Sequence, residues 1–138
     1  MLANGITLGY KKKSDTSSSF ANLPGLKEVP EIGDEPEKVD VTCLSDSHKK
    51  YEQGIGDYGD LSYTFKYDNS SATSSYRVLR KAQEDKEVLT FEETLPDGTK
   101  LTYDAQVNVK LGGGGVNGAI DFTCTMTIQS DIDITDPS

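Results

Sequence analysis

The chain has 138 residues, which is enough for one domain and short for two. It carries 23 acidic against 14 basic residues, a formal net charge of -9, with 34% hydrophobic residues and no Trp. Such an acidic surface repels phosphate backbones and anionic lipid headgroups, so we expect neither tight nucleic-acid binding nor membrane association. The composition predicts a single domain over residues 1–138 with a thin core, made in the cytoplasm because residues 1–10 lack a signal-peptide pattern.

Apolar and polar residues alternate in several segments of the first half, which is the pattern of strands buried on one face. Residues 6–10 carry a short stripe, residues 39–43 a second one and residues 61–67 a longer third one. We expect all three apolar stripes to face the core. Their members are Ile6, Leu8 and Tyr10, then Val39, Val41 and Cys43, and then Leu61, Tyr63, Phe65 and Tyr67.

Three stretches between these strands have no core face. Residues 12–22 are Ser-rich, and residues 24–36 hold three of the five prolines, which predicts extended chain on the surface. Residues 45–59 are polar and long for a loop in a small domain. Loops of this length are usually functional or disordered.

One segment follows a helical period instead. Ala72, Tyr76, Leu79 and Ala82 recur at helical spacing, and N-cap candidates precede them in Asp68–Ser71. The spacing predicts one helix over residues 72–83, buried along a single stripe. Such a helix is suited to cover an open end or face of the sheets.

The C-terminal half predicts an antiparallel meander of residues 87–95, 100–111 and 118–129. The tight turn Pro96–Thr99 joins the first pair, and the glycines 112–115 join the second. The inward stripes are Leu89, Phe91 and Leu95, interrupted by Glu93; Leu101, Tyr103, Ala105, Val107, Val109 and Leu111; and Ile120, Phe122, Cys124, Met126 and Ile128. Residues 131–138 predict an extended C-terminal arm. The fold class is therefore mainly β, with two packed antiparallel sheets in a sandwich or partly open barrel, and one α-helix.

No residue pattern points to catalysis, a cofactor or a metal. His48 is the only histidine, which leaves it without a partner for a metal cluster or a proton relay, and we expect it to be exposed. Cys43 and Cys124 both fall on apolar faces, so we expect two buried thiols, with a mutual disulfide as the alternative. The chain also has no nucleophile elbow. We therefore expect a protein that is not an enzyme.

The order of elements resembles a known family. A short β opening over Asn4–Lys11 leads to Leu23–Gly33, then to Glu35–Thr42, to the loop that ends in Tyr51–Gly54, to the strand Leu61–Tyr67 and to the single helix. This order is similar to that of the major tail, or tail tube, proteins of long non-contractile-tailed bacteriophages. The resemblance implies a fold shared with the tube protein of type VI secretion.

The resemblance also implies a structural role in the virion tail. Six subunits would form a ring, and rings would stack into a tube whose length a tape-measure protein sets. Baseplate and tail-terminator proteins would be further partners. DNA would pass through the tube during ejection without tight binding, and the subunit would be found in the host cytoplasm during assembly.

Two sets of candidate residues follow from that role. A lumen that DNA must traverse should present acids, because cations there would bind phosphates. Asp104 and Asp121, on the polar faces of two predicted strands, are the candidate lumen-facing acids. The loop 45–59 is the candidate inter-subunit or inter-ring contact, with His48, Lys49, Lys50, Tyr51, Glu52, Asp57 and Tyr58 as its contact residues.

The alternative function is a small β-sandwich binding module, such as a carbohydrate-recognition or baseplate accessory domain. Such modules usually bind through exposed aromatic rings. Most Tyr and Phe residues of this chain fall on inward faces, with Tyr51 and Tyr58 as the exceptions. Rings or tubes in electron micrographs would distinguish the tail tube subunit from this module.

Overall fold

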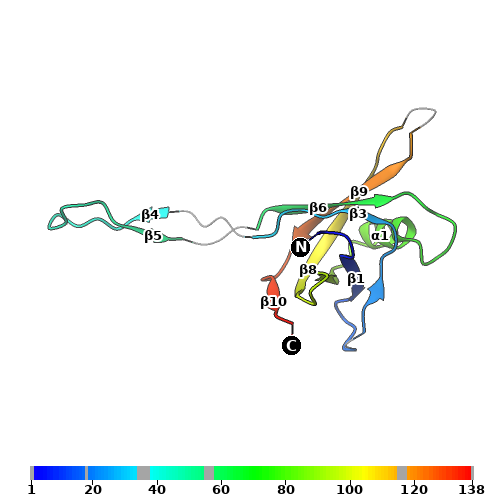
Figure 1. The fold of residues 1–138 in the computed structure, drawn as a ribbon, viewed down its shortest axis with the longest axis horizontal. Coiled ribbons are helices and arrows are strands. Elements are labelled where there is room, and N and C mark those ends of the chain that lie inside the picture. The colour runs from blue at the N-terminus through cyan, green and yellow to red at the C-terminus, as the bar shows by residue number, and fades with distance from the viewer. Residues whose placement is uncertain (1, 18, 34–37, 55–57, 115–117, 138) are drawn as a thin grey trace.

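The computed structural model describes residues 2–17, 19–33, 38–54, 58–114 and 118–137 (Figure 1). These residues form one helix and a set of strands whose pairings are all antiparallel. In chain order, the elements are β1 (Thr7–Lys12), β2 (Ala21–Asn22), β3 (Leu26–Glu28), β4 (Lys38–Asp40), β5 (Tyr51–Gln53), β6 (Asp60–Lys66), α1 (Ser75–Glu84), β7 (Leu89–Thr94), β8 (Lys100–Leu111), β9 (Asp121–Ile128) and β10 (Asp133–Thr135).

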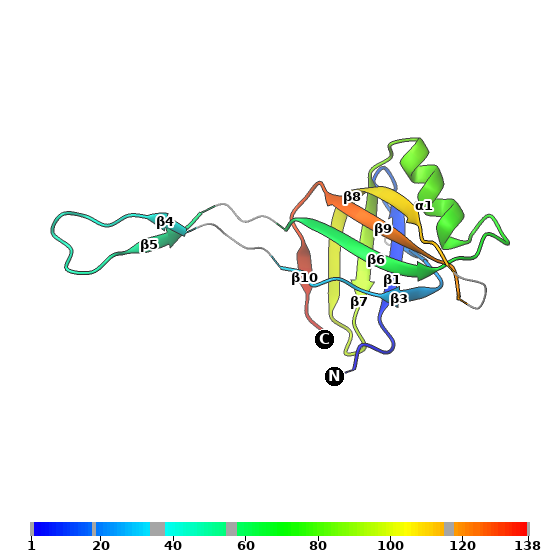
Figure 2. The ribbon, with the colours of Figure 1, turned by 90° about the horizontal axis from the view of Figure 1, so that it is seen from above.

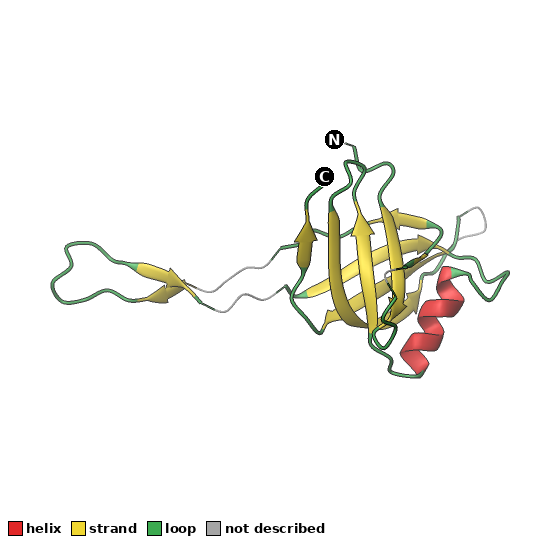
Figure 3. Cartoon of the chain, turned by 90° about the horizontal axis from the view of Figure 1, so that it is seen from below, coloured by secondary structure: helices red, strands yellow, loops and turns green. Residues whose placement is uncertain are grey.

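One curled sheet makes up the body of the molecule. Its strand order is β2-β1-β7-β8-β9-β6-β3, and β10 also pairs with β8. The long strand β8 belongs to both layers, because residues 100–105 pair with β7 and residues 105–111 pair with β9. The two halves of the sheet therefore cross, and the core lies between them (Figures 2 and 3). The predicted mainly β fold with one helix is confirmed, and its two layers are halves of one continuous sheet.

The predicted meander is confirmed as β7, β8 and β9. Its first turn is closed by backbone hydrogen bonds from Leu95 N to Thr99 O, at 2.8 Å, and from Gly98 N to Leu95 O, at 2.9 Å. Gly98 adopts φ +98°, a conformation that residues with a Cβ rarely reach. The glycine in this turn therefore fixes the register of the hairpin.

The core is built from the alternating stripes. Phe65 and Phe122, on the paired strands β6 and β9, are fully buried and stack at 5.2 Å between ring centroids. Tyr76 of the helix meets Phe122 edge-on at 5.4 Å. The buried residues come from both layers and the helix, and they are Leu8, Leu23, Leu61, Tyr63, Phe65, Leu79, Ala82, Leu89, Phe91, Tyr103, Ala105, Val107, Phe122, Cys124 and Met126.

The helix starts three residues later than predicted. Ala72 is exposed and precedes it, and Ser74 is the N-cap. The loop before the helix is held in a non-helical shape by Arg77, which donates to the Asn69 side chain at 2.8 Å and to the Asn69 carbonyl at 2.9 Å. At the other end, Gln83 accepts a hydrogen bond from Val109 N at 2.7 Å, which ties the helix to β8.

Glu93, which interrupts the apolar stripe of β7, is 3% exposed and belongs to a polar network inside the core. The Tyr103 hydroxyl donates to the Tyr63 hydroxyl at 2.7 Å, and Tyr63 donates to Glu93 Oε1 at 2.9 Å. Burial raises the pKa of Glu93 and raises the pKa of both tyrosines, because a charge in the core loses its hydration. The Tyr63 hydroxyl of β6 therefore joins Tyr103 of β8 to the Glu93 carboxyl group of β7.

Two ends of the predicted inward stripes are exposed, and the prediction for them was wrong. Leu111 is 50% and Ile120 is 48% exposed, because β8 and β9 extend beyond the opposite layer and none of the described residues covers their ends (Figure 1). Cys124, nearer the middle of β9, is buried as predicted, and burial raises its pKa to about 12. Both cysteines are free, so the alternative of a disulfide between them was wrong.

The sequence patterns missed the short edge strands. β2 pairs with β1, β3 pairs with β6, and β10 pairs with residues 100–102 of β8. Leu23, between the Ser-rich and Pro-rich stretches, is buried in the core, and its N–H donates to Leu8 O at 2.8 Å. These strands have two or three residues each, too few to show a period of two.

Candidate functional site

A hairpin projects from one end of the body (Figures 1 and 2). Its strands β4 and β5 pair as a separate two-stranded sheet, with Val39 opposite Glu52 and Asp40 opposite Tyr51. The bond from Val41 N to Lys50 O, at 3.0 Å, extends the ladder toward the tip. We call residues 38–53 the projecting hairpin. It includes most of the predicted loop 45–59 but begins before it, at Lys38.

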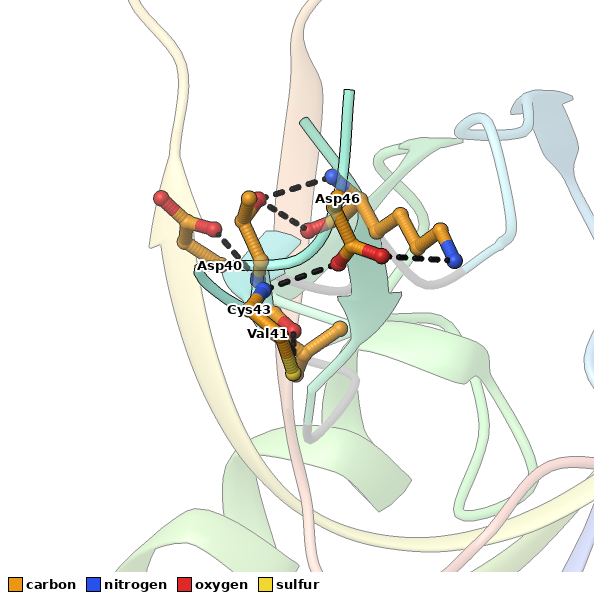
Figure 4. Close-up of polar contacts among 6 residues, drawn as sticks. Asp40, Val41, Cys43 and Asp46 are labelled. Atoms are coloured by element: carbon orange, nitrogen blue, oxygen red, sulfur yellow. Dashed lines mark hydrogen bonds and ion pairs between the residues drawn. The ribbon is translucent and has the colours of Figure 1, made fainter. Parts of the chain in front are cut away.

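The tip of the projecting hairpin is held by its own polar side chains (Figure 4). Cys43 N donates to Asp46 Oδ2 at 2.8 Å, and Lys50 Nζ lies 3.1 Å from Asp46 Oδ1. Lys50 N donates to Thr42 Oγ1 at 2.8 Å. Thr42 N donates to Asp40 Oδ1 at 2.9 Å, and hydrogen bonds from Thr42 lower the pKa of Asp40. These bonds shape the tip without help from the body.

The apolar stripe of the projecting hairpin is exposed, and its predicted burial was wrong. Val39 is 47% and Val41 is 37% exposed, and the Cys43 thiol is exposed as well. The strands alternate as predicted, but the hairpin lies outside the body, so no described strand or helix covers its apolar face (Figure 2). Leu44 at the tip and Tyr51 on β5 are also exposed. The sequence signal for this placement is that the stripe stands alone, between a Pro-rich and a Gly-rich stretch.

The structure brings five of the predicted contact residues together on the projecting hairpin. These are His48, Lys49, Lys50, Tyr51 and Glu52, and all of them are exposed. Tyr58 lies apart, half-buried at the root of the hairpin, where it lines an open hollow of about 820 Å³ with Asp60 and residues 127–131. Asp57 lies outside the described residues. Nothing in the sequence patterns indicated the hollow.

Asp104 and Asp121 are not brought together. Asp104 lies on the outer face of the layer that contains β7, where Thr90 donates to it at 2.6 Å and Lys13 Nζ lies 3.8 Å away. Asp121 lies on the outer face of the layer that contains β6, and Lys27 Nζ lies 2.9 Å from its Oδ2. Because the core separates the layers, these carboxylates occupy different outer faces, each beside one lysine.

Metal-binding side chains are not clustered in the described residues. Within them, no group of three or more His, Cys, Asp or Glu side chains is placed to hold a metal ion. None of the helices in the described ranges is long and apolar enough to cross a membrane. What the described residues do show is an exposed apolar surface on the projecting hairpin, beside a body with a buried core.

Solved structures share this fold. A chain in the virion of a native gene transfer agent particle matches with a TM-score of 0.72 and 18% identity, over 98% of both chains. A chain in the tail of an empty gene transfer agent particle, determined with C6 symmetry, matches with a TM-score of 0.67 and 24% identity, over 93% of this chain and 95% of that one. The tail tube of SPP1 matches with a TM-score of 0.71 and 8% identity, over 96% of this chain and 77% of that one.

The sequence gives the family. The family model of phage tail tube proteins matches residues 9–136, nearly the whole chain. The chain therefore belongs to the phage tail tube protein family, whose members are structural components of phage-like tails. No curated protein matches the sequence significantly.

Proposed function

We propose that this chain is the repeating subunit of a tail tube in which six copies form a ring and rings stack into a hollow conduit for DNA. The C6 symmetry of the gene transfer agent tail supports the ring number. Closing a ring by head-to-tail contacts between identical subunits is a common outcome of symmetric assembly. The subunit has a structural role and no catalytic one.

The observation that carries the proposal is the projecting hairpin. An isolated two-stranded hairpin is marginally stable in water, and exposed β-branched residues gain nothing from facing solvent. A hairpin that keeps an apolar stripe outside its own body is suited to bury that stripe against a neighbouring subunit. His48, Lys49, Lys50, Tyr51 and Glu52 would then surround the contact as its polar rim.

The acidic balance supports the passage of DNA. A wall with a net negative charge releases no counterions from DNA and so does not hold it. Asp104 and Asp121 are the proposed lumen-facing acids, and each stands on the outer face of one layer. The layer that lines the lumen determines which of the two carboxylates meets the DNA.

The proposed partners are the remaining tail proteins. A tape-measure protein would set the length of the tube, and a baseplate and a terminator would close its ends. The location is the virion tail, with the host cytoplasm as the site of assembly. No membrane partner is proposed.

Negative-stain electron microscopy of concentrated purified protein tests the proposal. Rings or tubes are expected, and dispersed monomers at every concentration would favour a small binding module instead. A variant in which a short Gly–Ser turn replaces residues 38–53 should stay folded and monomeric. Tubes formed by that variant would contradict the role of the projecting hairpin.

The lumen residues are tested by Asp104→Lys and Asp121→Lys in assembled particles. Of the two variants, the one whose lysine lies on the layer that lines the lumen should leave tubes intact but impair DNA delivery, because a lysine in the wall binds phosphates. Asp104→Asn and Asp121→Asn are the matched controls, since they remove the ion pair without adding a cation. Normal delivery by the double Lys variant would rule out both residues.

A further inference from the structure

Asn4 and Gly5 form the corner of a tight turn before β1. One backbone hydrogen bond closes this turn, from Ile6 N to Ala3 O at 3.2 Å, and Gly5 adopts φ +104°. Both corner residues are exposed. Within the described residues, no group accepts a hydrogen bond from Gly5 N, and the Asn4 side chain has no hydrogen-bond partner. The turn therefore leaves a side-chain amide and the next backbone nitrogen open to solvent together.

The next backbone nitrogen is hydrogen-bonded at the other asparagines that the structure describes, Asn22, Asn69 and Asn108. These bonds run from Leu23 N to Leu8 O at 2.8 Å, from Ser70 N to Asp68 Oδ1 at 3.0 Å and from Val109 N to Gln83 Oε1 at 2.7 Å. A nitrogen whose proton is bound in this way is a poor nucleophile until the bond opens. Asn4 thus differs from these asparagines in its surroundings and not only in the glycine that follows it.

We propose that Asn4 is a site of spontaneous deamidation. In this reaction Gly5 N attacks Asn4 Cγ, a bond forms between the two atoms, and the bond from Cγ to the side-chain nitrogen breaks. That nitrogen leaves as ammonia and takes the proton of Gly5 N with it. Water then opens the resulting succinimide ring at either carbonyl group, which gives aspartate or isoaspartate. Gly5 favours the attack because it has no Cβ to crowd the ring.

The product would change the region between the start of β1 and the edge strand β3. Residues 3–6 and 26–29 line a hollow of about 470 Å³ there, with Lys27 and Glu28 among them. Deamidation adds a carboxylate beside this hollow, in a chain whose net charge is already -9. Isoaspartate also lengthens the backbone by one carbon shortly before Thr7, which pairs with Thr94. The modification therefore acts at an edge of the sheet.

The hairpin turn at Gly98 offers a matched control. Asp97 precedes Gly98 in this turn, and Gly98 N donates to Leu95 O at 2.9 Å. Asp97→Asn therefore places the same dipeptide in the same molecule, with its attacking nitrogen hydrogen-bonded. Asparagine can still accept the hydrogen bond that Thr99 N donates to Asp97 Oδ1 at 3.0 Å, so the turn should persist. The two positions then differ in fold and not in chemistry.

Peptide mapping of the folded Asp97→Asn variant by mass spectrometry, after storage in mildly alkaline buffer, tests the proposal. Deamidation adds one mass unit, and trypsin releases the two positions on different peptides because it cleaves after Lys11 and Lys86. The peptide with Asn4 should gain this mass at least about tenfold faster than the peptide with position 97, whose turn must open first. In denaturant the two rates should become similar, because neither turn persists. Similar rates in the folded variant, or no gain at Asn4, would overturn the proposal.

Asn4→Gln checks the reacting residue. Glutamine needs a larger ring, which closes far more slowly, so the gain should disappear from the peptide that ends at Lys11. An undiminished gain in that peptide would contradict the succinimide route. Asn117 is also followed by glycine but lies outside the described residues, and its peptide is scored separately. Neither measurement depends on tube assembly, so a failure here is distinguishable from a failure of the proposed function.

Discussion

In the body of this molecule, Tyr63 and Phe122 have lost nearly all contact with solvent, whereas in the projecting hairpin Val39 and Val41 keep a third or more of their exposure. Both regions consist of antiparallel strands with alternating apolar residues. The two regions differ in what packs against their apolar face: the body sheet curls over itself and adds a helix, whereas no described strand or helix of the body lies against the projecting hairpin (Figure 3). Strand pairing satisfies the backbone, but only a second layer removes apolar surface from water.

The two regions are consequently held by different forces. Aromatic and aliphatic contacts such as the Phe65–Phe122 stack hold the body, and polar contacts around Asp46 hold the tip of the projecting hairpin. Under the proposed function a neighbouring subunit covers Val39 and Val41, so we expect mutations in the two regions to affect different measurements.

The largest expected difference comes from truncating one apolar residue in each region. Phe122→Ala should lower the free energy of unfolding by about 3–5 kcal/mol, because it removes a buried ring and leaves a cavity between Phe65 and Tyr76. Val41→Ala should change it by less than about 0.5 kcal/mol, since Val41 is exposed in the single chain. Urea denaturation of both variants measures the effect. A comparable loss in Val41→Ala would mean that the hairpin is part of the body.

A smaller effect on the free energy of unfolding is expected from the Glu93 carboxyl group inside the body. Burial raises the pKa of Glu93, so the folded chain keeps this proton to a higher pH than the unfolded chain does. The stabilisation is fully present below the unfolded pKa, near 4.5, and is lost as the pH rises through the folded pKa. Glu93→Gln should therefore become more stable relative to wild type as the pH rises through the folded pKa of Glu93.

Chemical denaturation between pH 4 and pH 8 measures this difference. Glu92→Gln is the matched control, because Glu92 lies on the outer face of the same strand, 3.9 Å from Lys100 Nζ. Glu93→Leu should lose about 1–3 kcal/mol at pH 4, because it leaves the Tyr63 hydroxyl without an acceptor, and this loss should shrink as the pH rises. If the free energies of unfolding of wild type and Glu93→Gln differ by the same amount at every pH, the raised pKa of Glu93 is contradicted.

The outcomes of the sequence predictions follow the same division. The meander and the helix were predictable, because their stripes are long and the turn at Gly98 has a specific chemistry. The exposure of Val39, Val41, Leu111 and Ile120 was not, because alternation shows only that one face is apolar and not whether the chain itself supplies the cover. An interface between subunits and a core leave the same pattern in a sequence.

Within the candidate site, the sequence indicated the region but not its shape. The absence of a core face in residues 45–59 identified part of the projecting hairpin. The pairing of β4 with β5 was missed, because three-residue strands carry too short a pattern. The hollow beside Tyr58 depends on residues 127–131, which are far from Tyr58 in sequence, and only the fold brings them together.

The smallest global effect is expected from Asp46→Ala at the hairpin tip. The substitution removes the acceptor of Cys43 N and the partner of Lys50, so the amide of Cys43 should exchange with solvent about tenfold faster. The melting temperature of the body should not move, because Asp46 touches none of its strands. Hydrogen exchange measures both effects, with Lys49→Ala as the control for an exposed side chain at the same tip.

Hydrogen exchange also distinguishes local from global opening. If the projecting hairpin opens independently, Asp46→Ala will leave the amides of β6 and β9 protected, although β6 follows the hairpin in the chain. Loss of protection in those strands would show that the hairpin and the body unfold together. Independent opening is what a docking element requires: the hairpin can then adjust to a neighbouring subunit without loosening the core that holds the subunit together.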